Sequence, residues 1–291
     1  MEGAPVAVWI YAGVAVKQLT IRTHRYAPDV FQTTGGNTLE ERAIPDAGSS
    51  VMPSVISLFD LTGTLAKPWL ASHHVYQFDM QLEPSQGERI TLINGTADTW
   101  KEQLDRLCRE EEISIILSQP PCNDLAVSGS RWFNKKFQEN PNYRKEAMEL
   151  VYIARDLGEK YNIPYAIENP VSVISTEWKK PSLTFHPFEY GGYLPVDDDP
   201  KLYGPLYQIT PPQDRYYKKT CIWAGEGFVH PEKRPVDPIP VESRQSKLGG
   251  KSDRTKNLRS ACARGWALAV YEANSNRVVR TPLGLQITMG I

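Results

Sequence analysis

The sequence predicts an α/β fold built on a mainly parallel sheet. Short apolar runs alternate with longer segments of helical periodicity over residues 54–168. Such alternation is typical of parallel strands joined by right-handed crossovers. The chain has 291 residues and 41% hydrophobic content, which is enough for one large domain. Because ligands bind at the carboxyl ends of parallel strands, a functional site is expected at that edge of the sheet.

The expected elements follow one another from residue 54 onward. Strands are predicted at 54–60, 74–79, 89–93, 113–118 and 165–168, and helices from residue 66, at 99–110 and at 142–161. After Pro170 the sequence becomes rich in Pro, Gly and Tyr, which predicts an irregular region. One clear strand is expected inside that region at 220–223, and a last helix at 255–273.

The chain is expected to divide into four segments. Residues 1–50 are predicted to be an N-terminal extension with a β-rich start, because linker-like runs of Gly, Ser, Asn and Asp precede the first regular strand. The βα alternation occupies 51–175, the loop-rich region 176–250, and a C-terminal helix that packs back on the rest 251–291. All the motifs described below lie after residue 51, so the extension is predicted to be dispensable for chemistry.

Composition excludes several classes of protein. The 33 Lys and Arg against 34 Asp and Glu give a net charge of −1, so any nucleic-acid surface would have to be local. The four cysteines are far apart and form no Cys-x-x-Cys pair, so no metal site is expected and a reducing, cytoplasmic setting is predicted. The apolar run at 4–16 is shorter than the roughly 20 residues of a membrane helix, and no signal peptide is recognisable.

Two polar motifs close neighbouring apolar strands. In Pro120-Pro121-Cys122, the prolines fix the backbone before the thiol, and rigid placement suits a nucleophile. Glu168-Asn169-Pro170 places a carboxylate in the same position after the strand at 165–168. The alternatives are a buried structural cysteine and a glutamate in a cap or salt bridge. Strand ends of one parallel sheet meet at one edge, so Cys122 and Glu168 are predicted to share a crevice.

A possible nucleotide-binding turn follows the first strand. The segment 59–64 contains Gly63, which permits a tight turn and a close approach of a ligand to the backbone. Asp79, after the next strand, could accept hydrogen bonds from ribose hydroxyls. With a single glycine, an ordinary strand-to-helix turn and a surface aspartate are the alternatives.

Two basic segments could contact phosphates. Residues 243–259 concentrate Lys and Arg around a Gly-Gly pair, and residues 214–219 place two tyrosines beside cations. Solvated basic loops are the common alternative for both.

Taken together, the motifs resemble the DNA cytosine-5 methyltransferases, in particular short bacteriophage-type members. The resemblance rests on Phe59-Asp60-Leu61-Thr62-Gly63, Pro120-Pro121-Cys122 and Glu168-Asn169-Pro170 in that order, and covers roughly residues 55–273. Further local likenesses lie at 125–132, 218–223 and 259–270. The sequence departs from the family in the cofactor turn, which lacks a second glycine, and in the short stretch between Trp223 and Gly250, which predicts short or relaxed target specificity.

The resemblance implies a Rossmann-like S-adenosylmethionine-dependent methyltransferase fold with a small target-recognition region at 176–250. It implies that Cys122 attacks C6 of a cytosine flipped out of double-stranded DNA while Glu168 contacts N3, so that C5 accepts the methyl group. Contacts with S-adenosyl-L-methionine are then expected from Phe59, Asp60, Gly63, Asp79 and Pro120. Contacts with DNA are expected from Arg131, Arg215, Lys218, Lys219, Lys251 and Arg254.

The same resemblance leaves other activities open. A monomer without metal or membrane partners is expected, in a bacterial host cell if a phage encodes it. The same fold could act on free pyrimidine nucleotides, or with a modified adenosylmethionine that delivers a group other than methyl. A catalytically silent DNA-binding decoy is a further alternative. Methyl label from the cofactor that appears in duplex DNA would indicate a DNA substrate. Label that appears only in nucleotides would indicate a free nucleotide substrate.

Overall fold

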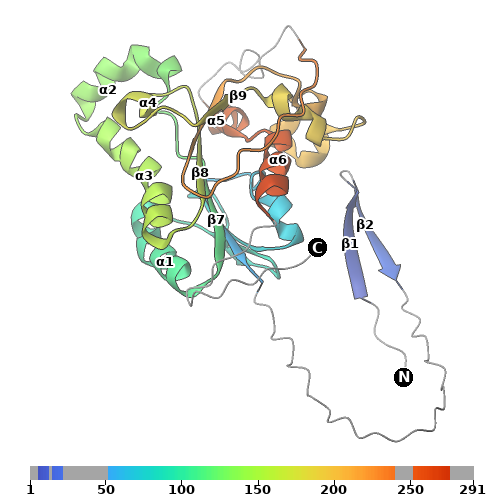
Figure 1. Ribbon diagram of the computed structural model, residues 1–291. Coiled ribbons are helices and arrows are strands. Elements are labelled where there is room, and N and C mark those ends of the chain that lie inside the picture. Colours follow the sequence, from blue (N-terminus) through green and yellow to red (C-terminus); the bar gives the residue numbers. More distant parts are fainter. Residues whose placement is uncertain (1–5, 13–14, 22–51, 240–251, 276–291) are drawn as a thin grey trace, which may run out of the picture. The chain divides into compact units, whose positions relative to one another are not determined.

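The computed structural model describes residues 6–12, 15–21, 52–239 and 252–275 (Figure 1). The chain divides into two compact units, Met1–Val51 and Met52–Ile291. In the first, β1 (Val6–Ala12) pairs antiparallel with β2 (Ala15–Ile21). The division of the chain into four functional segments stays a prediction.

The second unit contains an eight-stranded sheet in the order β5-β6-β4-β3-β7-β8-β10-β9. The parallel strands are β3 (Ser54–Leu58), β4 (His74–Phe78), β6 (Ile90–Ile93), β7 (Ile113–Ser118) and β8 (Tyr165–Pro170). Antiparallel pairing joins β5 (Ser85–Gln86) to β6, and β10 (Thr220–Ala224) to both β8 and β9 (Leu183–Phe185). The predicted α/β fold with a mainly parallel sheet is confirmed.

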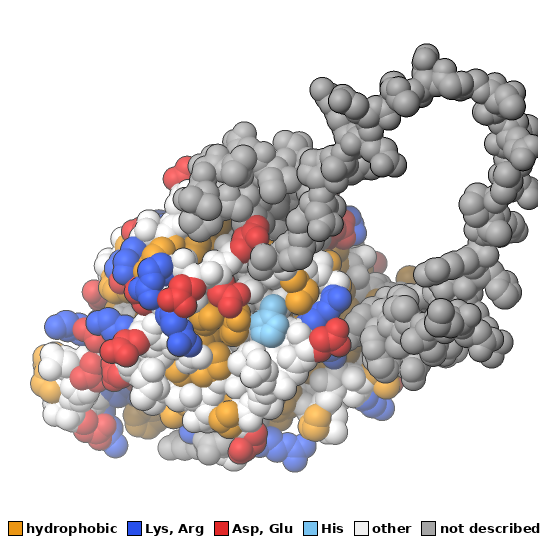
Figure 2. All heavy atoms as spheres, turned by 90° about the horizontal axis from the view of Figure 1, so that it is seen from below, with side chains coloured by type: hydrophobic (Ala, Val, Ile, Leu, Met, Phe, Trp, Pro, Cys, Tyr) orange, Lys and Arg blue, Asp and Glu red, His pale blue; other side chains and the backbone are white. Residues whose placement is uncertain are grey.

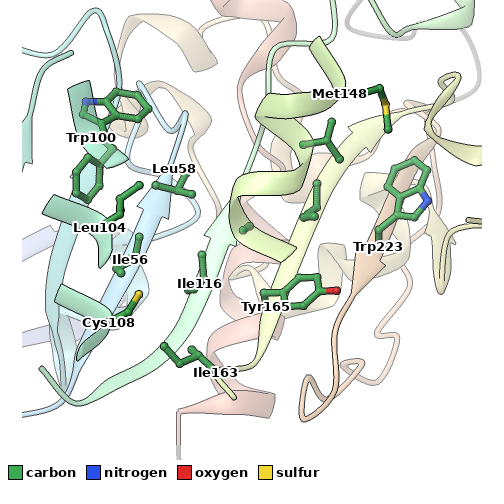
Figure 3. Packing of buried hydrophobic residues seen from close by; sticks show 14 of the residues in the cluster. Ile56, Leu58, Trp100, Leu104, Cys108, Ile116, Met148, Ile163, Tyr165 and Trp223 are labelled. Carbon is green, nitrogen blue, oxygen red and sulfur yellow. The ribbon is translucent and has the colours of Figure 1, made fainter. Parts of the chain in front are cut away.

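Helices cover both faces of this sheet, so its central strands are apolar on both sides. All five residues of β3 are buried, and Ile56 and Leu58 face one core while Val55 faces the other. The helices α1 (Ala97–Glu110) and α3 (Tyr143–Tyr161) cover the first core, and α6 (Arg264–Asn274) lies on the opposite side (Figure 1). Figure 3 shows Ile56 and Leu58 beside Trp100 and Leu104 of α1.

The predicted helices at 99–110 and 142–161 are confirmed as α1 and α3, with starts shifted by two residues or fewer. The helix expected from residue 66 is only a 3-10 turn, η1 (Lys67–Ala71), because β4 already begins at His74 and leaves no room for a longer one. Two short helices were not predicted, α2 (Phe133–Glu139) and α4 (Ile174–Glu177).

The single helix expected at 255–273 is wrong. The structure has α5 (Asp253–Ser260) and α6, separated by three buried residues, Ala261, Cys262 and Ala263, of which Ala263 is extended. The break is stabilised from outside the segment, because Asp214 Oδ2 accepts hydrogen bonds from the backbone nitrogens of Arg264 at 2.6 Å and Gly265 at 3.1 Å. A carboxylate at this place satisfies free N–H groups of the first turn of α6.

The irregular region predicted after Pro170 contains short 3-10 helices, each with a proline in its first turn, where the missing N–H costs nothing. They are η3 (Pro187–Tyr193), η4 (Pro200–Tyr203), η5 (Pro205–Tyr207) and η6 (Pro212–Asp214).

A buried ion cluster attaches this region to α6. The side chains of Arg264, Asp198 and Asp214 are 0% exposed. Arg264 Nη1 and Nη2 lie 2.9 and 2.8 Å from the two oxygens of Asp198, and its Nε and Nη2 lie 3.0 and 2.8 Å from Asp214 Oδ1. Asp214 and Gln213 have φ values of 49° and 53°, which are unfavourable for residues other than glycine. Charge-assisted hydrogen bonds in a dry environment hold this strained turn in place.

The surface seen from below in Figure 2 carries Lys and Arg side chains interspersed with Asp and Glu around apolar side chains. Among the residues described here, no helix is long and apolar enough to cross a membrane.

Arg264→Met should remove the cation and leave the carboxylates of Asp198 and Asp214 buried with backbone donors but without a positive charge. We expect the free energy of unfolding to fall by about 3–5 kcal/mol, measured by urea denaturation. Arg234→Met is the matched control, because Arg234 pairs with Glu272 at the surface, where an ion pair contributes little. Similar losses in the two variants would contradict a structural role for the cluster.

Candidate active site at the carboxyl edge of the sheet

The Cys122 loop is attached directly to the end of β8. Ser118 of β7 pairs with Ile167 of β8, so Glu168 follows immediately beyond the paired residues. The Asn169 side chain donates a hydrogen bond to the carbonyl oxygen of Pro120 at 2.9 Å. The loop then turns, since the Cys122 carbonyl accepts from the nitrogens of Leu125 and Ala126. The predicted proximity of the two motifs therefore has a specific physical link.

Glu168 is 8% exposed and lies opposite Ile222 of β10. The Cys262 thiol donates to its Oε2 over 3.4 Å. Burial raises the pKa of the Glu168 carboxyl, while Lys218 and the Cys262 thiol oppose that rise. Glu168 is therefore a carboxyl that holds its proton to higher pH than an exposed glutamate, as a general acid requires.

Cys122 is a free, partly buried thiol. Burial raises its pKa, and the charge of Lys218 is the strongest opposing influence, followed by the loop's own backbone. Asp124 adds to the rise, but its carboxylate is paired with Lys136 at 2.6 Å. The neutral thiol thus predominates in the absence of a substrate, and a nearby positive charge favours the thiolate.

Lys218 is the cation whose charge acts on both Cys122 and Glu168. It precedes β10, and its Nζ lies 3.4 Å from the carbonyl oxygen of Ala261, in the break between α5 and α6. Lys218 was predicted to contact DNA. The structure brings it together with the two predicted catalytic residues.

The predicted cofactor turn contains two residues with positive φ, Phe59 at 56° and Gly63 at 64°. Such a conformation is unfavourable for phenylalanine, and residues held in this way cluster at functional sites. At Gly63 a Cβ atom would lie 2.8 Å from Gln77 Oε1, at the end of a side chain that can shift, so the positive φ is the main reason for glycine here. Gln77 in turn donates to the carbonyl oxygen of Asp60 at 2.6 Å.

Asp60 turns its carboxyl into this loop. Its oxygens accept from Ser57 Oγ at 3.0 Å, from Thr62 Oγ1 at 3.3 Å and from the nitrogen of Ala66 at 3.4 Å. Burial raises the pKa of Asp60 to about 6 against these three donors. Asp60 therefore shapes the turn, and a direct contact between it and a cofactor stays a prediction.

Asp79 and Pro120 follow β4 and β7, the two strands on either side of β3, at the same edge of the sheet. Asp79 follows β4, is 8% exposed, and accepts from the nitrogen of Gln81 at 2.9 Å. Burial raises the pKa of its carboxyl. Pro120 is buried at the end of β7. Their roles in cofactor binding stay predictions.

The residues predicted to contact DNA occupy different environments. Arg131, Lys219 and Arg254 are exposed, and Arg215 and Lys218 are half-buried. The Arg131 guanidinium lies 5.3 Å from the Trp132 ring centroid. Lys251 lies outside the described residues. Contact between these side chains and DNA stays a prediction.

Cys262 and Tyr207 were missed as site residues. The Tyr207 hydroxyl lies 2.7 Å from Thr64 Oγ1 and 2.9 Å from the Cys262 carbonyl oxygen, so it joins the cofactor turn to the break between α5 and α6. No sequence signal identifies Cys262, because it falls inside a segment with helical periodicity and 94 positions from Glu168. In the described part of the chain, no group of three His, Cys, Asp or Glu side chains could hold a metal ion.

A groove between α1 and α3 lies beside this edge. Its walls carry charged side chains and its floor includes Leu104, Ile153 and Leu157. Pro121 and Asp124 border it, but Cys122 and Glu168 do not. We therefore place the candidate chemistry at the strand ends.

Lys218→Met should raise the pKa of the Cys122 thiol, because it removes the main positive charge that acts on the thiol. The rate of Cys122 alkylation by iodoacetamide, measured against pH, should reach its midpoint at a higher pH than in the unaltered protein. Lys219→Met is the control for an exposed neighbour. An unchanged midpoint in Lys218→Met would contradict the coupling.

Asp60 should make the protein less stable as pH rises. Folding raises its pKa from 3.8 to about 6, so the folded chain binds more protons than the unfolded chain between these values. The free energy of unfolding should therefore decrease through this window, by on the order of 2–3 kcal/mol. Urea unfolding at a series of pH values should show a smaller decrease in Asp60→Asn. Equal decreases in both proteins would assign the effect to other groups.

The chain matches no protein-family model, and no curated protein matches it. Among solved structures it is similar to the MycE methyltransferase from the mycinamycin biosynthetic pathway, in one complex with Mg and SAH and in another with Mg, SAH and mycinamycin VI. The sequence identities are 15% and 16%, and the TM-score is 0.26 for both. The matches cover 66% of this chain and 44% of each MycE chain, so the chain spans less than half the length of these proteins.

Proposed function

We propose that this chain is an S-adenosylmethionine-dependent methyltransferase that acts on C5 of cytosine in double-stranded DNA. One observation carries the proposal: the link from Asn169 to Pro120 ties the Cys122 loop to the strand that bears Glu168. The charge of Lys218 acts on both reactive groups. A thiol and a carboxyl with raised pKa at one sheet edge are the two groups that this reaction needs.

The chemistry explains why both groups are needed. C5 of cytosine is a poor nucleophile until a thiolate adds to C6 and converts the ring to an enamine. Cys122 would form the bond to C6, and Lys218 would favour its thiolate. Glu168 would donate its proton to N3, so that the negative charge of addition does not build up on the ring. After C5 has accepted a methyl group, loss of its proton to water re-forms the double bond between C5 and C6 and expels Cys122 as the thiolate, and N3 returns its proton to Glu168.

The turn at 59–63 and Asp79 are suited to hold the adenosyl part of the cofactor. Because Gly63 has no side chain, the cofactor could approach the backbone of the turn closely, and the aromatic ring of Phe59 could contact it. The Asp79 carboxyl could accept hydrogen bonds from ribose hydroxyls. When bound, S-adenosylmethionine supplies an electrophilic methyl group. The protein's own contribution is to hold Cys122 and Glu168 at the same edge of the sheet, where both could reach one pyrimidine ring.

DNA would be held by the exposed cations. Arg131, Lys219 and Arg254 could contact phosphates, which position the duplex without reading its sequence. Flipping one cytosine from the stack costs about a few kcal/mol, which these contacts would have to offset.

Free pyrimidine nucleotides are the second candidate substrate. The observation in their favour is the short stretch after β10, because residues 225–239 contribute no helix or strand that could read a duplex. The chemistry at Cys122 and Glu168 would be unchanged. Only the molecule that receives the methyl group would differ.

Methyl-labelled S-adenosylmethionine incubated with the protein and duplex DNA should yield labelled 5-methylcytosine, identified by mass spectrometry. Cys122→Ala should abolish the transfer, because no covalent adduct can form. Glu168→Gln should slow it by roughly 10²- to 10⁴-fold, the usual contribution of a general acid.

Cys108→Ala, a buried cysteine of α1, is the matched control and should retain transfer. Label found only in nucleotides would favour the second candidate. A product mass other than that of a methyl group would point to a modified donor. Transfer by Cys122→Ala at the normal rate would overturn the mechanism.

A further inference from the structure

The second thiol of the site, Cys262, is in contact with the proposed general acid. Its Sγ lies 3.4 Å from Glu168 Oε2, and Cys262 is 0% exposed. It is therefore sheltered from solvent and does not resemble a second nucleophile. Its single hydrogen has two acceptors at this distance, Glu168 Oε2 and the carbonyl oxygen of Ala263, and an ionised Glu168 is the stronger acceptor of the two.

The position of this thiol is set by groups far away in the sequence. Tyr207 lies at hydrogen-bond distance from the Cys262 carbonyl oxygen, and Asp214 binds the backbone nitrogens of the two residues that follow Ala263. The Cys262 side chain thus lies in a break between helices that is anchored on both sides. An anchored donor can fix the rotamer of its acceptor.

The proton on Glu168 can occupy either oxygen in the absence of other contacts. While the thiol donates to Oε2, the proton is better placed on Oε1, because a proton on Oε2 would have to turn away from the thiol hydrogen. We propose that Cys262 is a positioning residue that holds the Glu168 carboxyl and keeps its acidic proton on Oε1, the oxygen that delivers it to the pyrimidine ring. This inference rests on the function proposed above.

The charges around Glu168 define what removal of the thiol should do. Burial raises the pKa of Glu168, Lys218 and the Cys262 hydrogen bond lower it, and Asp60 lies within electrostatic range. Burial, with the nearby carboxyls of Glu168 and Asp60, raises the pKa of Cys262 well above its usual value, so its thiol keeps its hydrogen and remains a donor. Loss of that donor should raise the pKa of Glu168 further.

A titration of the protein without substrate tests the contact directly. Protein labelled with carbon-13 at glutamate carboxyls is titrated by NMR, and the Glu168 signal is assigned by its loss in Glu168→Gln. The midpoint should move to higher pH in Cys262→Ala and should stay at or below its normal position in Cys262→Ser, which retains a donor. Cys262→Val fills the space without a donor and should behave like Cys262→Ala, which keeps the test valid if the alanine variant does not fold.

Cys108→Ala is the control for loss of a buried thiol elsewhere and should leave the midpoint in place. Equal midpoints in Cys262→Val, Cys108→Ala and the unaltered protein would overturn the inference.

Single-turnover methyl transfer provides the second readout. Cys262→Val should slow the transfer step by roughly three- to tenfold with little change in the DNA concentration at half-saturation, and Cys262→Ser should restore the rate. Equal losses in the serine and valine variants would indicate a packing role and contradict the inference. If the unaltered protein transfers no label, the proposed function fails, whereas the NMR titration still decides whether Cys262 controls Glu168.

Discussion

The candidate site depends on the burial of one guanidinium. Arg264 lies between Asp198 and Asp214 without access to water, and an ion pair in such a place is costly to form and costly to break. The role of this ion cluster is to fix the positions of the backbone segments around it. The cluster fixes the start of α6, and with it the three residues that place Cys262 against Glu168 and the Ala261 carbonyl oxygen near Lys218. Asp198 and Asp214 of the loop-rich region are therefore connected, through the start of α6, to the thiol that contacts Glu168 at the end of β8.

Local patterns were sufficient to predict most of the sheet. The apolar run at 113–118 could be recognised because a doubly covered strand needs no alternation, and α3 because its apolar positions recur at helical spacing. The break at 261–263 could not be recognised, because its cause, Asp214, lies about fifty positions earlier. The strained turn at Gln213 and Asp214 was equally invisible, since its φ values are imposed by the ion cluster and not by local preference.

The candidate site divides in the same way. The places of Cys122 and Glu168 at one edge could be predicted, because both lie near the carboxyl ends of apolar parallel strands, and their catalytic roles stay predictions. The partners of these residues could not be predicted from the sequence. Asn169 binds Pro120, Lys218 acts on Cys122, and Cys262 contacts Glu168, and each pair joins segments that only the fold brings together. Asp60 shows that a residue in a recognisable motif can have a local role. Its carboxyl accepts hydrogen bonds from groups in and beside its own turn.

The alternation of side chains along β8 restricts how this protein can change. Glu168 shares its face with Ala166 and meets Cys262, whereas Asn169 shares the other face with Ile167 and binds Pro120. One residue inserted or deleted between Tyr165 and Glu168 would exchange the two faces, so that the amide would meet the thiol and the carboxylate the proline loop. Variation in length is therefore confined to the connecting loops, while 165–170 must keep its spacing in any relative that uses the same pair.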